Sequence, residues 1–166
     1  MRIALAAVTG LVLLCCGCST AEPRALETAA ATAPVNCAET VATPAGSRPA
    51  PLATSTGSWF GASDLWVGLP DHAASAQGEA IVLKFPWVTL QTDKPTQALG
   101  APQVSATSSG TTTPVAASFG PYSQSYGTGG LSFWPATVEF PAPGCWTVSG
   151  VLGATTVEFV VKVDAP

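Results

Sequence analysis

The sequence predicts an all-β fold for the segment that begins near Gly57 and runs to the end of the chain. Within this segment apolar residues alternate with other residues, which is the period of strands with one buried face. Glycine and proline interrupt the alternating stretches at short intervals, as turns between strands require. No stretch after Gly57 keeps the period of a helix.

Five stretches carry this alternation. Their apolar positions are Leu65, Val67 and Leu69; Ile81, Leu83, Phe85 and Trp87; Trp134, Ala136, Val138 and Phe140; Trp146, Val148 and Leu152; and Val157, Phe159, Val161 and Val163. Gly153-Ala154 fits a hairpin turn between the last two strands. We expect Pro86 and Pro135 at sheet edges or bulges, because proline cannot donate to the hydrogen-bond ladder. The pattern predicts a β-sandwich of about seven strands, loosely immunoglobulin-like, over residues 57–166.

The first 17 residues are typical of a cleaved export signal. Arg2 supplies a positive charge, and an apolar run from Ile3 to Leu14 follows it. This run is shorter than the about 20 apolar residues with which a helix spans a membrane. We therefore expect a signal peptide over residues 1–17.

The end of the signal resembles the lipobox of bacterial lipoproteins, in which a small residue precedes the cysteine that becomes lipidated. Here Gly17 precedes Cys18, so we expect lipid on Cys18; Cys16 is a weaker candidate. Two or more acyl chains anchor a protein stably. The protein would then sit on the cell membrane or the outer membrane, facing the periplasm or the exterior. Ser19 favours the outer membrane, and a soluble secreted protein with a spare cysteine is the alternative.

Residues 18–56 differ in composition from the rest of the chain. They are rich in alanine, threonine and proline and contain no aromatic residue, so they bury too little apolar surface to order themselves. We read them as a lipid-anchored flexible tether, with residues 38–53 as an arm along the domain surface. Cys37 and Cys145 remain after the signal and the anchor, and in an oxidising compartment they most simply form a disulfide. Two free thiols are the alternative.

The charge pattern argues against nucleic acid as a partner. Charged residues make up 10% of the chain, against about a quarter in typical domains, and the formal net charge is −4. The three lysines, Lys84, Lys94 and Lys162, are scattered, whereas phosphate binding needs clustered cations.

Catalytic residues are sparse. His72 is the only histidine, and it follows Asp71 in a stretch that resembles a loop. A serine triad could use this pair, but the chain contains no G-x-S-x-G or S-x-x-K motif. Zinc needs several His or Cys ligands. We therefore expect no metal, no cofactor and no catalysis; a wall-active or ester-active hydrolase that uses Asp71 and His72 is the alternative.

Aromatic residues provide the candidate binding surface. Trp66 has the opposite parity to Leu65 and Val67, so it either packs under the arm or lies on the surface. Tyr122 and Tyr126 lie in a Gly/Ser/Tyr segment whose composition is typical of adaptable binding loops. Exposed aromatic rings bind sugar rings or protein partners, so an envelope protein or glycan is the expected partner. A simple connection between strands is the alternative for this loop.

Several short motifs follow one another along the chain. They are Asn36-Cys37, Trp59-Phe60-Gly61, Leu65-Trp66, Lys84-Phe85-Pro86-Trp87, Tyr126-Gly127 and the segment from Phe140 to Gly150, FPAPGCWTVSG. This order resembles a family of uncharacterised bacterial secreted and lipid-anchored proteins. The resemblance implies a β-sandwich with a cysteine pair and implies no reaction. Phe60 and Thr147 depart from the family's usual Tyr and Glu, and the basic segment often found after K-F-P-W is missing.

Taken together, these observations favour a non-catalytic, lipid-anchored domain that interacts at the cell envelope. A structural envelope component with no ligand is a further alternative.

Overall fold

The computed structural model describes residues 37–72, 74–77, 80–108, 113–125 and 129–165. The predicted signal peptide, Cys18, the first part of the predicted tether and Tyr126 lie outside these residues. Within the described residues no helix is long and apolar enough to cross a membrane.

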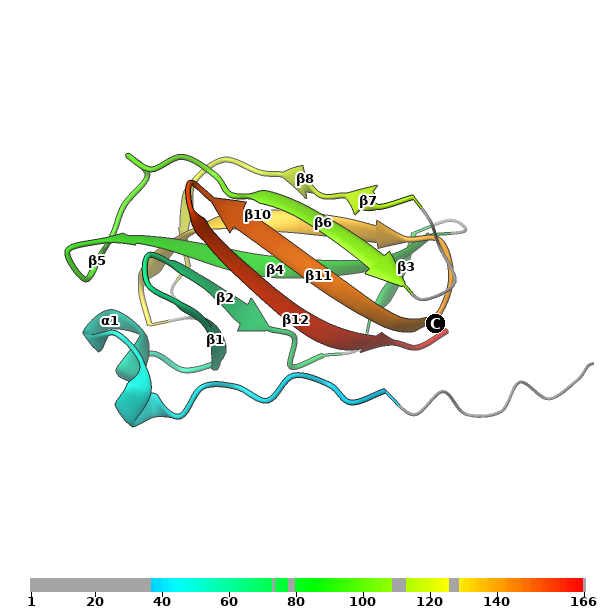
Figure 1. The fold of residues 1–166 in the computed structure, drawn as a ribbon, viewed down its shortest axis with the longest axis horizontal. Helices are drawn as coiled ribbons and strands as arrows, with labels where there is room; N and C mark the ends of the chain where they lie inside the picture. Colours follow the sequence, from blue (N-terminus) through cyan, green and yellow to red (C-terminus); the bar gives the residue numbers. More distant parts are fainter. Residues whose placement is uncertain (1–36, 73, 78–79, 109–112, 126–128, 166) are drawn as a thin grey trace, which may run out of the picture. The chain divides into compact units, whose positions relative to one another are not determined.

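Two antiparallel sheets form a sandwich, as the alternation predicts (Figure 1). The first sheet has the order β1-β2-β4-β10-β8, with β3, β5 and β9 paired to its long strands. The second has the order β12-β11-β6-β7. The strands of the first sheet are β1 (Ser58–Ala62), β2 (Leu65–Leu69), β3 (Ser75–Gln77), β4 (Ala80–Gln91), β5 (Lys94–Pro95), β8 (Ser118–Phe119), β9 (Ser123–Ser125) and β10 (Leu131–Phe140). Those of the second are β6 (Gln103–Ser108), β7 (Val115–Ala116), β11 (Gly144–Leu152) and β12 (Thr155–Val163).

The connectivity is immunoglobulin-like. The order β2-β4-β10-β8 corresponds to strands A, B, E and D of that fold, and β6, β11 and β12 correspond to C, F and G. The remaining strands are β1, which lies at the edge beside β2, and β3, β5, β7 and β9, which contain only two or three residues each. They account for the difference between the expected number of strands and the larger number in the described part of the chain. Gly153 and Ala154 join β11 to β12, as predicted.

The main core lies between the two sheets. The inward positions of β12, from Val157 to Val163, are at most 3% exposed, and the ring of Phe159 contacts that of Phe85 edge to face at 5.4 Å. A Cβ on Gly150 would lie 2.2 Å from the Trp87 ring, so β11 has space for that ring only because residue 150 is glycine. Each fully buried large apolar side chain stabilises the fold by roughly 1.5–3 kcal/mol.

Two segments connect the sheets along their sides. On one side the backbone of the arm binds both edge strands: Thr40 N–H donates to the carbonyl of Val160 on β12 at 3.0 Å, and Thr43 N–H donates to that of Trp59 on β1 at 2.8 Å (Figure 1). On the other side, residues 115–119 pair first with β6 through β7 and then with β10 through β8. On each side, a connecting segment therefore pairs with part of the sheet edge.

The arm is more ordered than its composition predicts. It contains a short 3-10 helix, η1 (Ala45–Ser47), and one helical turn, α1 (Ala50–Ala53). Leu52 in α1 is completely buried. It packs on the outer face of the first sheet in a second apolar cluster with Trp59, Trp66, Val88, Leu90 and Leu131.

Residues 38–53 run along the domain surface as the arm that the sequence analysis expects. Most of its residues stay at least partly exposed, and one leucine, placed over aromatic rings that the sheet already presents, packs α1 against the domain.

The expectation for the two prolines is wrong, because Pro86 and Pro135 lie on central strands rather than at edges or bulges. They face each other in the pairing of β4 with β10. The carbonyl of Pro135 accepts a hydrogen bond from Gly120 N–H at 2.9 Å, so its backbone polar groups point away from β4. The pair is therefore one that exchanges no hydrogen bond, and the missing N–H groups cost the β4–β10 ladder nothing.

Candidate functional site: a hollow on the outer face of the first sheet

A cavity of about 470 Å³ opens on the face of the first sheet that points away from the second sheet. We call it the hollow. Its lining comes from β1, β2, β4 and β10 and from the segments beside them: Thr56, Gly57, Ser58, Trp59, Gly68, Leu69, Pro70, Asp71, His72, Lys84, Phe85, Pro86, Phe133 and Pro135.

The floor is apolar and contains the two facing prolines. Gly68 lies beside Pro86, and a Cβ on Gly68 would approach the Pro86 ring to 2.7 Å. Gly120 has the same relation to Pro135, where the distance would be 2.9 Å. Each proline ring thus occupies space that a glycine on the neighbouring segment leaves open. Phe133, which is half-buried, extends the floor.

The rim is polar and carries charges of both signs. Asp71 and His72 follow β2, Lys84 projects from β4, and all three side chains are exposed. Thr56 and Ser58 also belong to the lining. Within the described residues the structure records no ion pair for Lys84 or Asp71, so their charges are available to a ligand.

Trp59 contributes a buried polar atom. Its side chain is 1% exposed, and its indole Nε1 has no hydrogen-bond partner among the described residues. Gly57, which also lines the hollow, is its close neighbour: a Cβ there would lie 3.4 Å from Nε1. The Arg48 guanidinium holds this part of the chain by donating to the carbonyls of Thr43 and Gly57, at 2.6 Å and 3.0 Å.

The three residues predicted to form a binding surface do not come together. Trp66 is 4% exposed, so its assignment to a binding surface is wrong; it packs beneath Leu52 of the arm, which was the alternative. Its indole N–H donates to the carbonyl of Ser63 at 3.1 Å. Trp66 faces this way because its parity directs it to the outer face, which the arm covers. Tyr126 lies outside the described residues.

Tyr122 is half-buried rather than freely exposed. Its ring packs against Trp134 with centroids 4.9 Å apart, and Trp134 Nε1 lies 3.4 Å from the Thr89 hydroxyl. Burial raises the pKa of Tyr122, and Ser132 beside the phenol lowers it by less. The phenol–Ser132 contact lacks the geometry of a regular hydrogen bond. Tyr122 is therefore part of the packing around Trp134.

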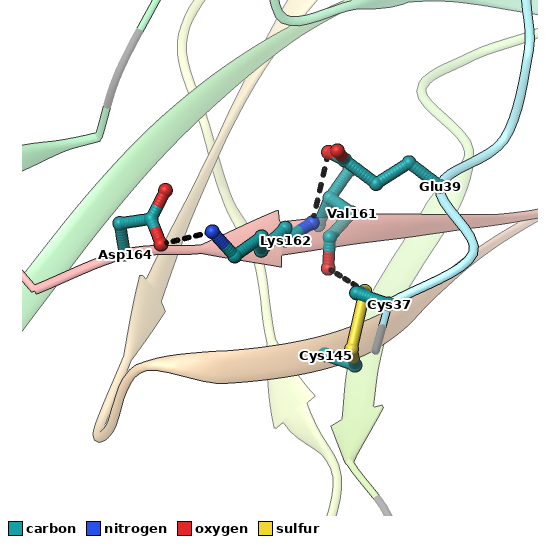
Figure 2. A network of polar contacts seen from close by, with 6 residues as sticks. All are labelled: Cys37, Glu39, Cys145, Val161, Lys162 and Asp164. Carbon is teal, nitrogen blue, oxygen red and sulfur yellow. Dashed lines mark hydrogen bonds and ion pairs between the residues drawn. A yellow bond between two sulfur atoms is a disulfide. The ribbon is translucent and has the colours of Figure 1, made fainter. Parts of the chain in front are cut away.

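The predicted disulfide joins Cys37 of the arm to Cys145 of β11, with Cα atoms 5.6 Å apart (Figure 2). Next to it, the Glu39 carboxylate accepts from the backbone N–H of Lys162 at 3.2 Å, and the Lys162 ammonium lies 2.7 Å from Asp164. The side-chain hydrogen bond from Lys162 to Asp164 and the attraction between their charges raise the pKa of Lys162. The start of the arm is thus fixed covalently to an inner strand of the second sheet.

Asp71 and His72 both lie on the rim of the hollow, so the alternative hydrolase reading would use the same place. Within the residues that the structure describes, no group of three or more His, Cys, Asp or Glu side chains is placed to hold a metal ion.

Two of the sequence motifs contribute residues to the hollow, but the motifs alone do not show that these residues lie side by side. The W-F-G motif contributes Trp59, and the K-F-P-W motif contributes Lys84, Phe85 and Pro86. The residues of the two motifs lie close together because β1 pairs with β2, β2 with β4, and β4 with β10.

Comparisons with protein-family models, with curated proteins and with solved structures found no match.

Proposed function

We propose that this protein is a lipid-anchored, non-catalytic binding domain of the bacterial cell envelope and that its ligand occupies the hollow. The observation that carries the proposal is the hollow itself. Its volume lies in the range of about 300–1,000 Å³ that is typical of ligand sites, and it combines an apolar floor with a few polar groups at the rim.

The surroundings of the hollow support binding over a role as a purely structural component. Its floor is built from paired strands and from Pro86 and Pro135, whose rings fix the backbone angle φ. The floor is therefore already formed before a ligand binds. Lys84 and Asp71 leave their charges exposed over this floor, although the chain is poor in charged residues.

The lipid anchor explains how the domain would be held at the envelope. Lipid on Cys18 would be followed by about 18 residues before the disulfide fixes Cys37. A flexible chain of that length spans roughly 25 Å, so the domain would stay close to the membrane surface.

The anchor can be tested with a pair of cysteine variants of the full chain in a bacterial host. We expect Cys18→Ala to move the protein from the membrane fraction to the soluble exported fraction and to abolish labelling by a fatty acid. Cys16→Ala is the matched control and should change neither result. Unchanged membrane association of Cys18→Ala would contradict the anchor.

Binding in the hollow can be tested by photo-crosslinking in cells. A benzophenone amino acid replaces Pro70, which lines the hollow, or, as control, Lys94, which is an exposed lysine on β5 outside it. We expect a discrete adduct from position 70 and none from position 94. Equal labelling at both positions, or none at position 70, would refute a ligand in the hollow.

A hydrolase is the second candidate, because Asp71, His72 and Ser58 are all lining residues of the same hollow. Purified protein that cleaves acetyl esters or envelope glycosides, with loss of that activity in both His72→Ala and Ser58→Ala, would favour this candidate over a binding role.

A further inference from the structure

We infer that the ligand of the hollow is a saccharide. The inference rests on the proposed function, since it names the ligand class for the same site. A pyranose ring presents C–H groups on its faces and hydroxyl groups around its edge. The hollow has the matching arrangement, with Phe133 and the two proline rings below and the polar residues Lys84 and Asp71 at the rim.

The rim suits hydroxyl groups, which both donate and accept hydrogen bonds. Lys84 can only donate, and the Asp71 carboxylate can only accept, so together they match both functions of a hydroxyl group. The positive charge of Lys84 and the negative charge of Asp71 nearly cancel. The rim therefore has no strong net charge that would attract a strongly charged ligand. A phosphate ligand would instead require several converging cations or backbone N–H groups.

The floor also disfavours a peptide bound as an added strand. Such binding needs the free edge of a sheet. The floor is made by inner strands, and β4 pairs with β2 on one side and with β10 on the other. Pro86 and Pro135 have no N–H to donate. Recognition here therefore depends on side chains and on shape.

Trp59 supplies an independent observation that points to a ligand. Its indole N–H is a donor that is buried in the lining and has no partner among the described residues. Buried donors are seldom left unpaired. Nε1 itself is covered, so a ligand hydroxyl would reach it only if the backbone at Gly57 shifted, and Gly57 carries no side chain that would then stand in the way.

The test is an NMR titration of the full chain carrying Cys18→Ala. The probes are oligosaccharides of N-acetylglucosamine, neutral hexose and uronic acid, and a capped proline-rich peptide. We expect at least one saccharide to shift the indole N–H signal of Trp59 together with the amides of Gly57, Gly68 and Lys84, while the peptide shifts none. Binding of the peptide alone, or no shift of these signals with any saccharide, would overturn the inference.

Two pairs of variants locate the binding. Trp59→Phe removes the indole N–H and keeps an aromatic ring, and Trp87→Phe is its control, because Trp87 Nε1 is equally buried and unpaired but lies in the core between the sheets. Lys84→Ala has Lys94→Ala as its control. We expect Trp59→Phe and Lys84→Ala each to weaken saccharide binding about tenfold, with both controls unchanged. Equal losses within either pair would contradict a site in the hollow.

Failure of this inference is distinguishable from failure of the proposed function. Crosslinking at position 70 to a protein, combined with no saccharide shift, would keep the binding role and reject the ligand class. Absence of both would reject the two together.

Discussion

Pro86 and Pro135 lie directly opposite each other on the two central strands β4 and β10. A proline inside a sheet normally removes a ladder hydrogen bond, yet here the two occupy a pair that exchanges none. On the other side of β4, its pairing with β2 ends where Val67 lies opposite Trp87, so Pro86 lies one position beyond the last residue pair. The two rings thus form a rigid apolar surface at the centre of the sheet, and this surface is the floor of the hollow.

The space left by Gly68 is the first testable feature. Gly68→Ala places a Cβ 2.7 Å from the Pro86 ring, which is too close for contact without movement. We expect a loss of about 1–3 kcal/mol in the free energy of unfolding, measured by denaturant titration. Gly46→Ala is the control, since a Cβ there meets no atom within 4 Å, and it should change stability by less than about 0.5 kcal/mol. Equal stability of the two variants would mean that Pro86 does not occupy this position.

The burial of Leu52 tests whether the arm belongs to the domain. Leu52→Ala removes the side chain that covers the outer aromatic cluster, and we expect a loss of about 2–5 kcal/mol. Tryptophan emission should shift to longer wavelength, because Trp59 and Trp66 lose their cover. Val41→Ala, in the same arm but at a side chain that is 84% exposed, should be nearly silent. A silent Leu52→Ala would indicate that the arm is not packed in solution.

The disulfide should stabilise the domain because it closes a long loop. Its cysteines are 108 residues apart, for which the chain-entropy model gives about 4.7 kcal/mol as an upper value. The double variant Cys37→Ser/Cys145→Ser, which leaves no unpaired thiol in the folded domain, should lose about 2–5 kcal/mol. A thiol titration of the unfolded, exported wild-type protein should find neither of these two cysteines free. Two reactive thiols, or a double variant as stable as the wild type, would contradict the pairing.

The titration of Tyr122 tests its packing against Trp134. Burial raises the pKa of Tyr122 above its ordinary 10.0. The neutral phenol therefore contributes its full stabilisation below pH 10, and this contribution is lost as the pH rises through the raised pKa. Because the chain has two tyrosines, the variant Tyr126→Phe leaves Tyr122 as the only phenol. Its ultraviolet absorbance should titrate above pH 10 in the folded protein and fall to about 10 on unfolding. A midpoint at or below 10 in the folded protein would contradict the burial.

The fold class and the inner face of the long strands could be predicted from local sequence patterns alone. Val157, Phe159, Val161 and Val163 point into the core because residues two apart in a strand share a face, and this local rule needs no knowledge of the neighbouring strands. The pairing of Cys37 with Cys145 was equally accessible, since only two cysteines remain once the signal and the anchor are assigned.

Only the tertiary structure decided which elements meet on the outer face. The alternation along the strand predicts that Trp66 and Leu65 point to opposite faces of the sheet. It does not predict that Leu52, more than ten residues earlier, covers Trp66. The central position of Pro86 and Pro135 depends on the register of β4 against β10, and the hollow depends on four strands being adjacent. Such contacts join residues that are distant along the chain. Their energy comes from the packed neighbours rather than from the local sequence, so a local pattern can suggest a face but cannot identify what lies against it.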